Sequence, residues 1–181
     1  IHGTYVDGGA FLSAFEILKR LAVDQRYDVE VLIVDSAKKE VKDAIENIGI
    51  NCIVLKRWNF TVFGRLLIGY LTVSRLKTYI NVFRDLAFSF YNINKFNIIV
   101  RETKPDIIHF NSIVMLPLCY FSKTGSKTIV HCREGFRPFP FMNIRSWVIK
   151  LFNSSVSKFI CISKNEKDKI DKFKKESYLS I

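Results

Sequence analysis

Residues that mark metal, disulfide and redox sites are scarce in this sequence. Its 181 residues include four cysteines and three histidines, with no CxxC pair and no cysteine-histidine cluster at metal-ligand spacing. The cysteines lie in or beside apolar runs, which indicates buried thiols in a reducing compartment. No residue pattern calls for a metal or a cofactor. The four cysteines are Cys52, Cys119, Cys132 and Cys161.

Hydrophobic runs long enough to cross a membrane are also missing. The apolar stretch LLIGYLTVS at residues 66–74 is too short to span a bilayer, and the start of the chain lacks the pattern of a signal peptide. We therefore expect one domain, residues 1–181, that is soluble or lies on a surface, and 49% apolar residues can form a full core. The glycine pair lies so close to Ile1 that a strand leading into it would be cut short. We therefore expect the sequence to be a piece of a longer protein.

Acidic residues are few, with 17 Asp and Glu against 28 Lys and Arg. Between residues 56 and 104, nine Lys and Arg meet only two acidic residues, and aromatic side chains alternate with the cations. Such a segment suits an anionic membrane surface. The alternative is that its apolar residues form core beneath solvated cations. Nucleic acid is disfavoured as a partner, because the sequence carries no RRM, KH or helix-turn-helix signature.

Short β-branched runs alternate with longer amphipathic segments, a pattern typical of a parallel sheet covered by helices. Gly49 supplies a stop signal for the helix expected at residues 37–49. We expect a three-layer, Rossmann-like α/β sandwich with a mostly parallel sheet of about six or seven strands. The expected strands are residues 29–34, 51–56, 106–110, 127–132 and 157–163.

Two features indicate a ligand site. Gly8 and Gly9 directly precede an expected helix, where exposed amide groups and the helix dipole suit phosphate, although a glycine pair can also simply make a turn. Polar residues close the expected strands, and in such folds ligands bind at the carboxyl ends of strands. These polar residues are Asp35, Ser36, Asn111, Ser112, His131, Arg133, Glu134 and Ser163.

Four segments occur in a fixed order along the chain: the glycine pair, KPDIIHFNS at residues 104–112, TIVHCREG at 128–135, and FICIS with a following glutamate at 159–166. Together they resemble the amino-terminal Rossmann-like domain of retaining GT-B glycosyltransferases of family 4, over nearly the whole chain. The resemblance implies a domain that shapes the acceptor site, while a second domain holds most of the nucleotide-sugar donor.

The resemblance also implies individual roles. His131 is similar to the histidine that faces the transferred sugar, where an imidazole can hydrogen-bond a hydroxyl or developing charge; the alternative is a satisfied histidine at a strand end. Gly8 and Gly9 resemble the loop that approaches the donor diphosphate and the acceptor. His109 matches a histidine that holds neighbouring loops, so we expect a structural role for it. Asn111 lies at the position where many members of the family carry a second histidine or another polar group.

Arg133 and Glu134 could orient an acceptor hydroxyl or pair with each other. Ser163 could present the start of a helix to the cleft, and with Glu166 it also has the sequence form of a capping box. The family's second domain usually carries two glutamates separated by seven residues, and this spacing does not occur here. We therefore expect the donor domain to be absent and the chain alone to be nearly inactive.

The sequence thus predicts the acceptor-side domain of a retaining, hexosyltransferase-type enzyme. It would move a sugar from a nucleotide-sugar donor to a glycan or lipid-linked acceptor in cell-envelope polysaccharide synthesis, in the cytoplasm at the inner membrane face. One alternative is a non-catalytic α/β binding or regulatory module, such as a flavodoxin-like receiver. A nucleotide-dependent oxidoreductase or epimerase is disfavoured, because GxGxxG is absent.

Overall fold

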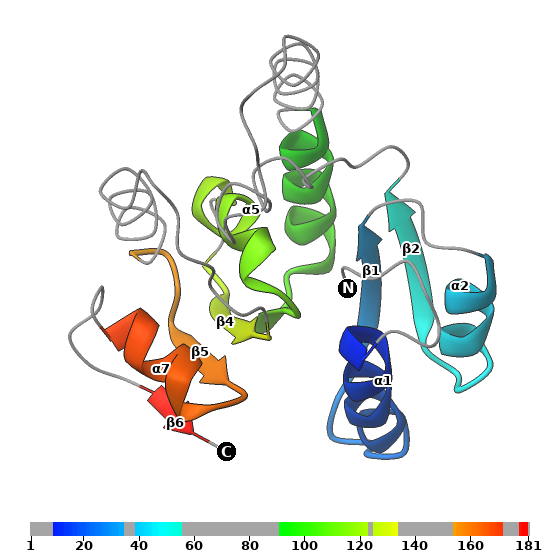
Figure 1. Cartoon of the computed structure of the whole chain (residues 1–181). Coiled ribbons are helices and arrows are strands. Elements are labelled where there is room, and N and C mark those ends of the chain that lie inside the picture. The colour runs from blue at the N-terminus through cyan, green and yellow to red at the C-terminus, as the bar shows by residue number, and fades with distance from the viewer. Residues whose placement is uncertain are drawn as a thin grey trace, which may run out of the picture. The chain divides into compact units, whose positions relative to one another are not determined.

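The computed structural model describes residues 9–34, 39–55, 91–122, 125–133, 154–171 and 178–180. The chain forms two compact units, residues 1–58 and residues 59–181. All strand pairs among the described residues are parallel, in one two-stranded and one four-stranded sheet with helices between the strands (Figure 1). This arrangement confirms the predicted α/β class with parallel strands and is consistent with the predicted Rossmann-like fold, although the described strands form two sheets where one sheet was expected.

The first unit is built from α1 (Gly9–Ala22), β1 (Glu30–Val34), α2 (Lys39–Glu46) and β2 (Asn51–Leu55). The two strands pair in parallel, with Val31 opposite Cys52. Parallel neighbours need a crossover, and α2 supplies it. Residues from both helices and both strands form one buried cluster, as expected of helices that cover a parallel sheet. The cluster comprises Phe11, Leu18, Val31, Ile33, Val41, Ile45, Ile50 and Cys52.

Gly49 ends the turn after α2 in the way that its position in the sequence predicted. Its φ is 82°, in the left-handed region, and its amide donates to the Glu46 carbonyl at 2.9 Å. A Cβ placed at this glycine would meet nothing within 4 Å. A side chain would therefore be disfavoured by the positive φ and not by a steric clash.

We therefore expect Gly49→Ala to lower the free energy of unfolding by about 1 kcal/mol. Urea denaturation of the two proteins measures this change. Gly49→Asn serves as the matched variant, because asparagine tolerates positive φ better than alanine does. Equal stability of the alanine variant and the wild type would contradict the assignment.

All four cysteines are buried thiols, as predicted. The pKa of Cys52 is raised to about 11, mostly by burial of the thiol and then by the nearby Glu46 carboxylate. The Cys52 thiol therefore stays protonated at neutral pH and has little reactivity.

The second unit contains the larger sheet, formed by β3 (Ile107–Phe110), β4 (Lys127–Cys132), β5 (Lys158–Cys161) and β6 (Tyr178–Ser180) in that order. A helix over residues 91–103 precedes β3. Between β3 and β4 lie the 3-10 turn η1 (Ile113–Met115) and α5 (Leu116–Phe121), and α7 (Lys164–Asp171) follows β5. The three strands expected in this part of the sequence are β3, β4 and β5.

The two faces of this sheet differ in polarity. On one face, Phe110, Val130 and Phe159 align across β3, β4 and β5 and are at most 5% exposed. The opposite face carries His109, His131 and Ile160. Because neighbours in register share a face, one set of side chains forms the core and the other sets the polar character of the site.

The helix over residues 91–103 is the part of the basic, aromatic segment that the structure describes. Phe96 is buried, with its ring centroid 6.0 Å from that of Phe110, so this aromatic belongs to the core. Tyr91 is exposed, and Lys95 Nζ lies 4.9 Å from its ring centroid. Residues 56–90 lie outside the described residues. Among the helices that are described, none is long and apolar enough to cross a membrane.

Candidate active site

Polar residues that close β3, β4 and β5 lie at one edge of the larger sheet, whereas Asp35 and Ser36, which follow β1, lie outside the described residues. β3, β4 and β5 are adjacent and parallel, so their carboxyl ends lie side by side. Asn111 follows β3, Arg133 follows β4, and Ser163 comes two residues after β5. The structure thus brings together three of the predicted site residues, beside His131 near the end of β4.

His131 and His109 form a stacked pair on one face of the sheet. His109 is in register with Ile129, two residues before His131, so both imidazoles lie on the same side of the sheet. Their ring centroids are 5.7 Å apart, and the ring planes differ by 24°. His131 is 5% exposed, whereas His109 is open to solvent on part of its surface. His109 therefore belongs to the same cluster as His131, a position that the structural role expected for it did not include.

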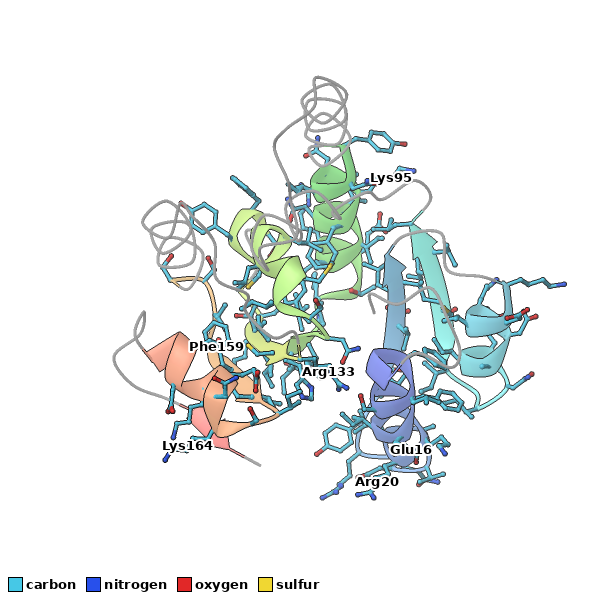
Figure 2. All side chains as sticks on the ribbon, in the orientation of Figure 1. Glu16, Arg20, Lys95, Arg133, Phe159 and Lys164 are labelled. Atoms are coloured by element: carbon cyan, nitrogen blue, oxygen red, sulfur yellow. The ribbon has the colours of Figure 1, made fainter. Side chains whose placement is uncertain are left out.

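Arg133 completes this cluster. Arg133 directly follows β4. Side chains two residues apart in an extended segment point to the same side, so Arg133 lies on the side of His131. Its Nη2 lies 3.0 Å from Nδ1 of His131 (Figure 2 shows Arg133 at the end of β4). Sequence reasoning offered Glu134 as the partner of Arg133. Glu134 lies outside the described residues, and the contact with His131 was not predicted.

The surroundings keep both imidazoles neutral. The pKa of His131 is lowered to about 4, mostly by burial of the ring and then by the charges of Arg133 and His109. The pKa of His109 is also lowered to about 4, first by the protein atoms crowded around its ring and then by Arg133. Because the His109 side chain is exposed, solvent screens both effects, so the lowered pKa is less pronounced at His109 than at the buried His131. A neutral imidazole with so low a pKa is a weak base and suits hydrogen bonding.

Asn111 and Ser112 are buried beside this cluster, at 4% and 1% exposed. Buried polar side chains at the end of a strand require partners, so these two residues are structurally engaged. Ser163 is exposed, and its hydroxyl donates to a carboxylate oxygen of Glu166, a buried residue in the first turn of α7. The two residues of the predicted capping box thus pair side chain to side chain at the start of α7. A contact of Ser163 with a ligand stays a prediction.

Gly9 is the first residue of α1 and is exposed. A Cβ at this position would meet nothing within 4 Å, so protein packing does not demand glycine there. The open space leaves the backbone accessible, as the predicted approach of a diphosphate requires. Gly8 lies outside the described residues. Gly9 belongs to the first unit, so its role in binding stays a prediction.

Sequence reasoning also missed a Tyr-x-x-x-Lys pair, Tyr91 and Lys95, a spacing found in some nucleotide-dependent oxidoreductases. The pair lies on the helix over residues 91–103, with the tyrosine 55% exposed and the lysine resting on its ring. No GxGxxG accompanies it in the sequence. This cation-π contact is a surface feature of the helix.

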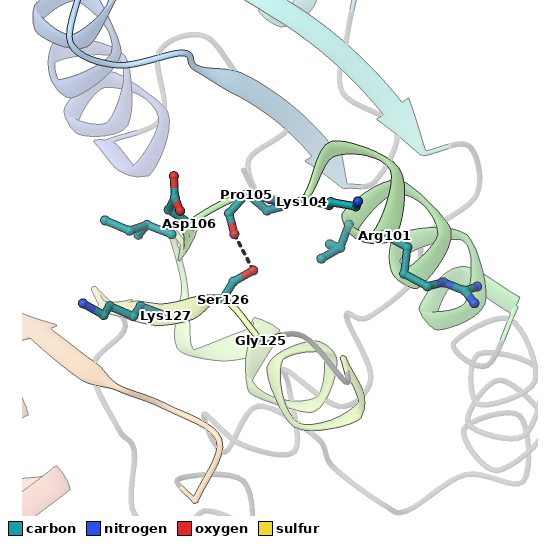
Figure 3. Close-up of a pocket in the computed structure, with 9 residues that line it drawn as sticks. Arg101, Lys104, Pro105, Asp106, Gly125, Ser126 and Lys127 are labelled. Atoms are coloured by element: carbon teal, nitrogen blue, oxygen red, sulfur yellow. Dashed lines mark hydrogen bonds between the residues drawn. The ribbon is translucent and has the colours of Figure 1, made fainter.

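An open hollow of about 590 Å³ lies at the opposite, amino ends of β3 and β4. It is lined by Lys104, Asp106 and Lys127 among others, and the Ser126 hydroxyl donates to the Pro105 carbonyl across it at 2.6 Å (Figure 3). Lys127 and Arg101 extend in opposite directions in this view, so their charges do not converge on one point. The carboxyl edge, where charged and polar groups do converge, is the better site.

No group of three or more His, Cys, Asp or Glu residues within the described part of the chain could hold a metal ion. The polar groups at the carboxyl edge are imidazole, guanidinium, amide and hydroxyl, which are hydrogen-bonding groups for a hydroxylated or anionic substrate.

Comparisons with known proteins agree with this chemistry. The family model described as Glycosyltransferase Family 4 matches residues 7–177, nearly the whole chain. Searches of the curated proteins and of the solved structures each gave no match at the threshold applied. The family match spans both units and contains every residue of the His109, His131 and Arg133 cluster. The chain therefore belongs to glycosyltransferase family 4, and it is a glycosyltransferase domain.

Proposed function

We propose that this domain forms the acceptor side of a retaining, hexosyltransferase-type enzyme, and that His131 contacts the transferred sugar. The observation that carries the proposal is the cluster of His131, His109 and Arg133 at the carboxyl edge of the sheet. There a buried, neutral imidazole is held in place by a stacked ring and a guanidinium. Ligands of open α/β sheets bind at this edge.

The proposed reaction depends on placement and electrostatics. An oriented imidazole N–H can donate a hydrogen bond to a hydroxyl of the transferred sugar and so hold the sugar in place as an oxocarbenium-like transition state forms. Asn111 and Arg133 lie beside His131 and are proposed to contact the donor or acceptor, together with Glu134 and Ser163. Gly8 and Gly9 are proposed to let the donor diphosphate approach the backbone at the start of α1.

The proposed donor is a nucleotide sugar, and the proposed acceptor is a glycan or a lipid-linked molecule of the cell envelope. No metal and no cofactor is part of this proposal. The net charge of +11 and the exposed Tyr91 and Lys95 on the helix over residues 91–103 support a cytoplasmic location at an anionic membrane surface. The donor domain is proposed to lie outside this chain, so transfer is expected only from the full-length gene product.

The test is sugar transfer by the full-length gene product from a panel of radiolabelled nucleotide sugars. Lipid extract and soluble glycan are offered as acceptors in separate reactions, and the product is separated by solvent extraction. Transfer from one donor into one fraction would support the proposal and would identify both substrates. A folded protein that transfers no sugar to either acceptor would contradict it and favour a non-catalytic binding module.

A further inference from the structure

We propose that Arg133 is a positioning residue that fixes His131 as the neutral tautomer carrying its proton on Nε2. The geometry rests on one contact, the 3.0 Å separation between Arg133 Nη2 and His131 Nδ1. This contact gives the two ring nitrogens of His131 different hydrogen-bonding roles. Nδ1 binds the protein, and the Nε2–H group is left to donate a hydrogen bond.

The chemistry of the guanidinium group determines which nitrogen carries the proton. Arginine has five N–H donors and no acceptor, and it stays charged at all physiological pH values. Nδ1 of His131 must therefore accept, which places the single proton of a neutral imidazole on Nε2. A doubly protonated ring would direct an N–H group and a positive charge at the guanidinium, which is unfavourable.

Two further observations agree with this assignment. Arg133 is half-buried and His131 is 5% exposed, so solvent competes little for the contact. His109 stacks on the other ring at a centroid distance of 5.7 Å, where a neutral imidazole packs better than a cation. Burial and the Arg133 charge also hold the pKa of His131 well below its ordinary value.

The consequence for catalysis rests on the proposed function. An imidazole whose Nδ1 is occupied can donate from Nε2 to a sugar oxygen, but it cannot remove a proton from an acceptor hydroxyl through that same nitrogen. Arg133 would thus fix His131 as a hydrogen-bond donor rather than a general base. The tautomer itself can be measured without any substrate.

The experiment is nitrogen-15 NMR of the 181-residue chain at neutral pH, observing the imidazole nitrogens through long-range couplings to the ring protons. The chain has only three histidines, so His109→Gln and His131→Gln variants assign the signals. We expect His131 to show a pyridine-type shift at Nδ1 and a pyrrole-type shift at Nε2. In Arg133→Met, the two shifts should move toward each other as the tautomers begin to exchange.

Arg133→Lys and Arg101→Met are the matched variants. A lysine ammonium also has donors and no acceptor, so Arg133→Lys should restore most of the wild-type pattern. Arg101 is exposed on the helix over residues 91–103 and donates to the Asn97 carbonyl at 3.2 Å, so Arg101→Met removes the same charge without touching His131. Its imidazole shifts should match those of the wild type.

In the full-length protein, Arg133→Met should lower kcat by roughly 10- to 100-fold with a smaller change in KM, the size of effect known for partners that orient metal-bound imidazoles. A wild-type spectrum with the proton on Nδ1, or a doubly protonated ring at neutral pH, would overturn the inference even if transfer were observed. So would an unchanged spectrum in Arg133→Met. The correct tautomer without any sugar transfer would instead count against the proposed function alone.

Discussion

Replacing His131 with alanine in the full-length protein is expected to reduce kcat for sugar transfer by about 10²- to 10³-fold, the usual loss when one preorganised hydrogen-bond donor is removed from an active site. The reason is that the buried imidazole is held by Arg133 and His109 in one orientation, so its N–H requires no reorganisation during the reaction. KM should change much less, because an interaction that strengthens in the transition state affects kcat and kcat/KM together.

His131→Gln distinguishes the two possible roles of the ring. A glutamine side chain can place an amide N–H near the position of Nε2 but cannot act as a base, so we expect it to recover part of the activity lost in the alanine variant. Steady-state kinetics of both variants provide the measurement. Lys158→Gln, an exposed change at the amino end of β5, is the control and should leave kcat unchanged. A glutamine variant as inactive as the alanine variant would contradict the donor role.

The second large effect concerns stability in acid. In the unfolded chain, His131 binds a proton near its ordinary pKa of 6.5, whereas in the folded protein its pKa is about 4. Between these values the unfolded state holds a proton that the folded state lacks, so stability falls as the pH falls. Above pH 6.5 the neutral His131 does not lower stability. At pH 5, protonation of His131 in the unfolded state should lower the free energy of unfolding by about 2 kcal/mol relative to that plateau.

Urea denaturation of the 181-residue chain at several pH values from about 7.5 to 5 measures this loss. The charged and titratable groups recorded around His131 in the described residues are Arg133 and His109, and both oppose its protonation. In His131→Gln the slope of unfolding free energy against pH should become shallower. His109→Gln should change the slope less, because solvent screens that exposed side chain. An unchanged slope in His131→Gln would show that His131 is not the group responsible.

Much of the architecture could be predicted from apolar periodicity. The strand expected at residues 127–132 matches β4, and the helix expected at 37–49 contains α2, because buried strands and one-sided helices leave strong patterns. The capping pair at Ser163 and Glu166 was also predictable, since caps depend on residues three apart. Such features are set by neighbours in sequence.

The chemistry of the candidate site was less predictable, because it depends on strand register. The sequence places His109 and His131 at the ends of two different strands. Only the pairing of Ile108 with Thr128 and of His109 with Ile129 brings both rings to one face at stacking distance. A one-residue shift in register would have placed them on opposite faces. The Arg133 contact could have been expected from the alternation of residues 131 and 133, but Glu134, its neighbour in sequence, offered a simpler partner.

Hydrogen exchange of the full-length protein, with and without each nucleotide sugar of the panel, tests the location of the substrate site most directly. We expect the ligand to slow exchange in overlapping peptides that cover Asn111 and Arg133, at the carboxyl edge of β3 and β4. Exchange near Pro105 and Ser126, beside the hollow at the amino ends of the same strands, should stay unchanged. Protection confined to that hollow, with none at the carboxyl edge, would contradict the proposed site.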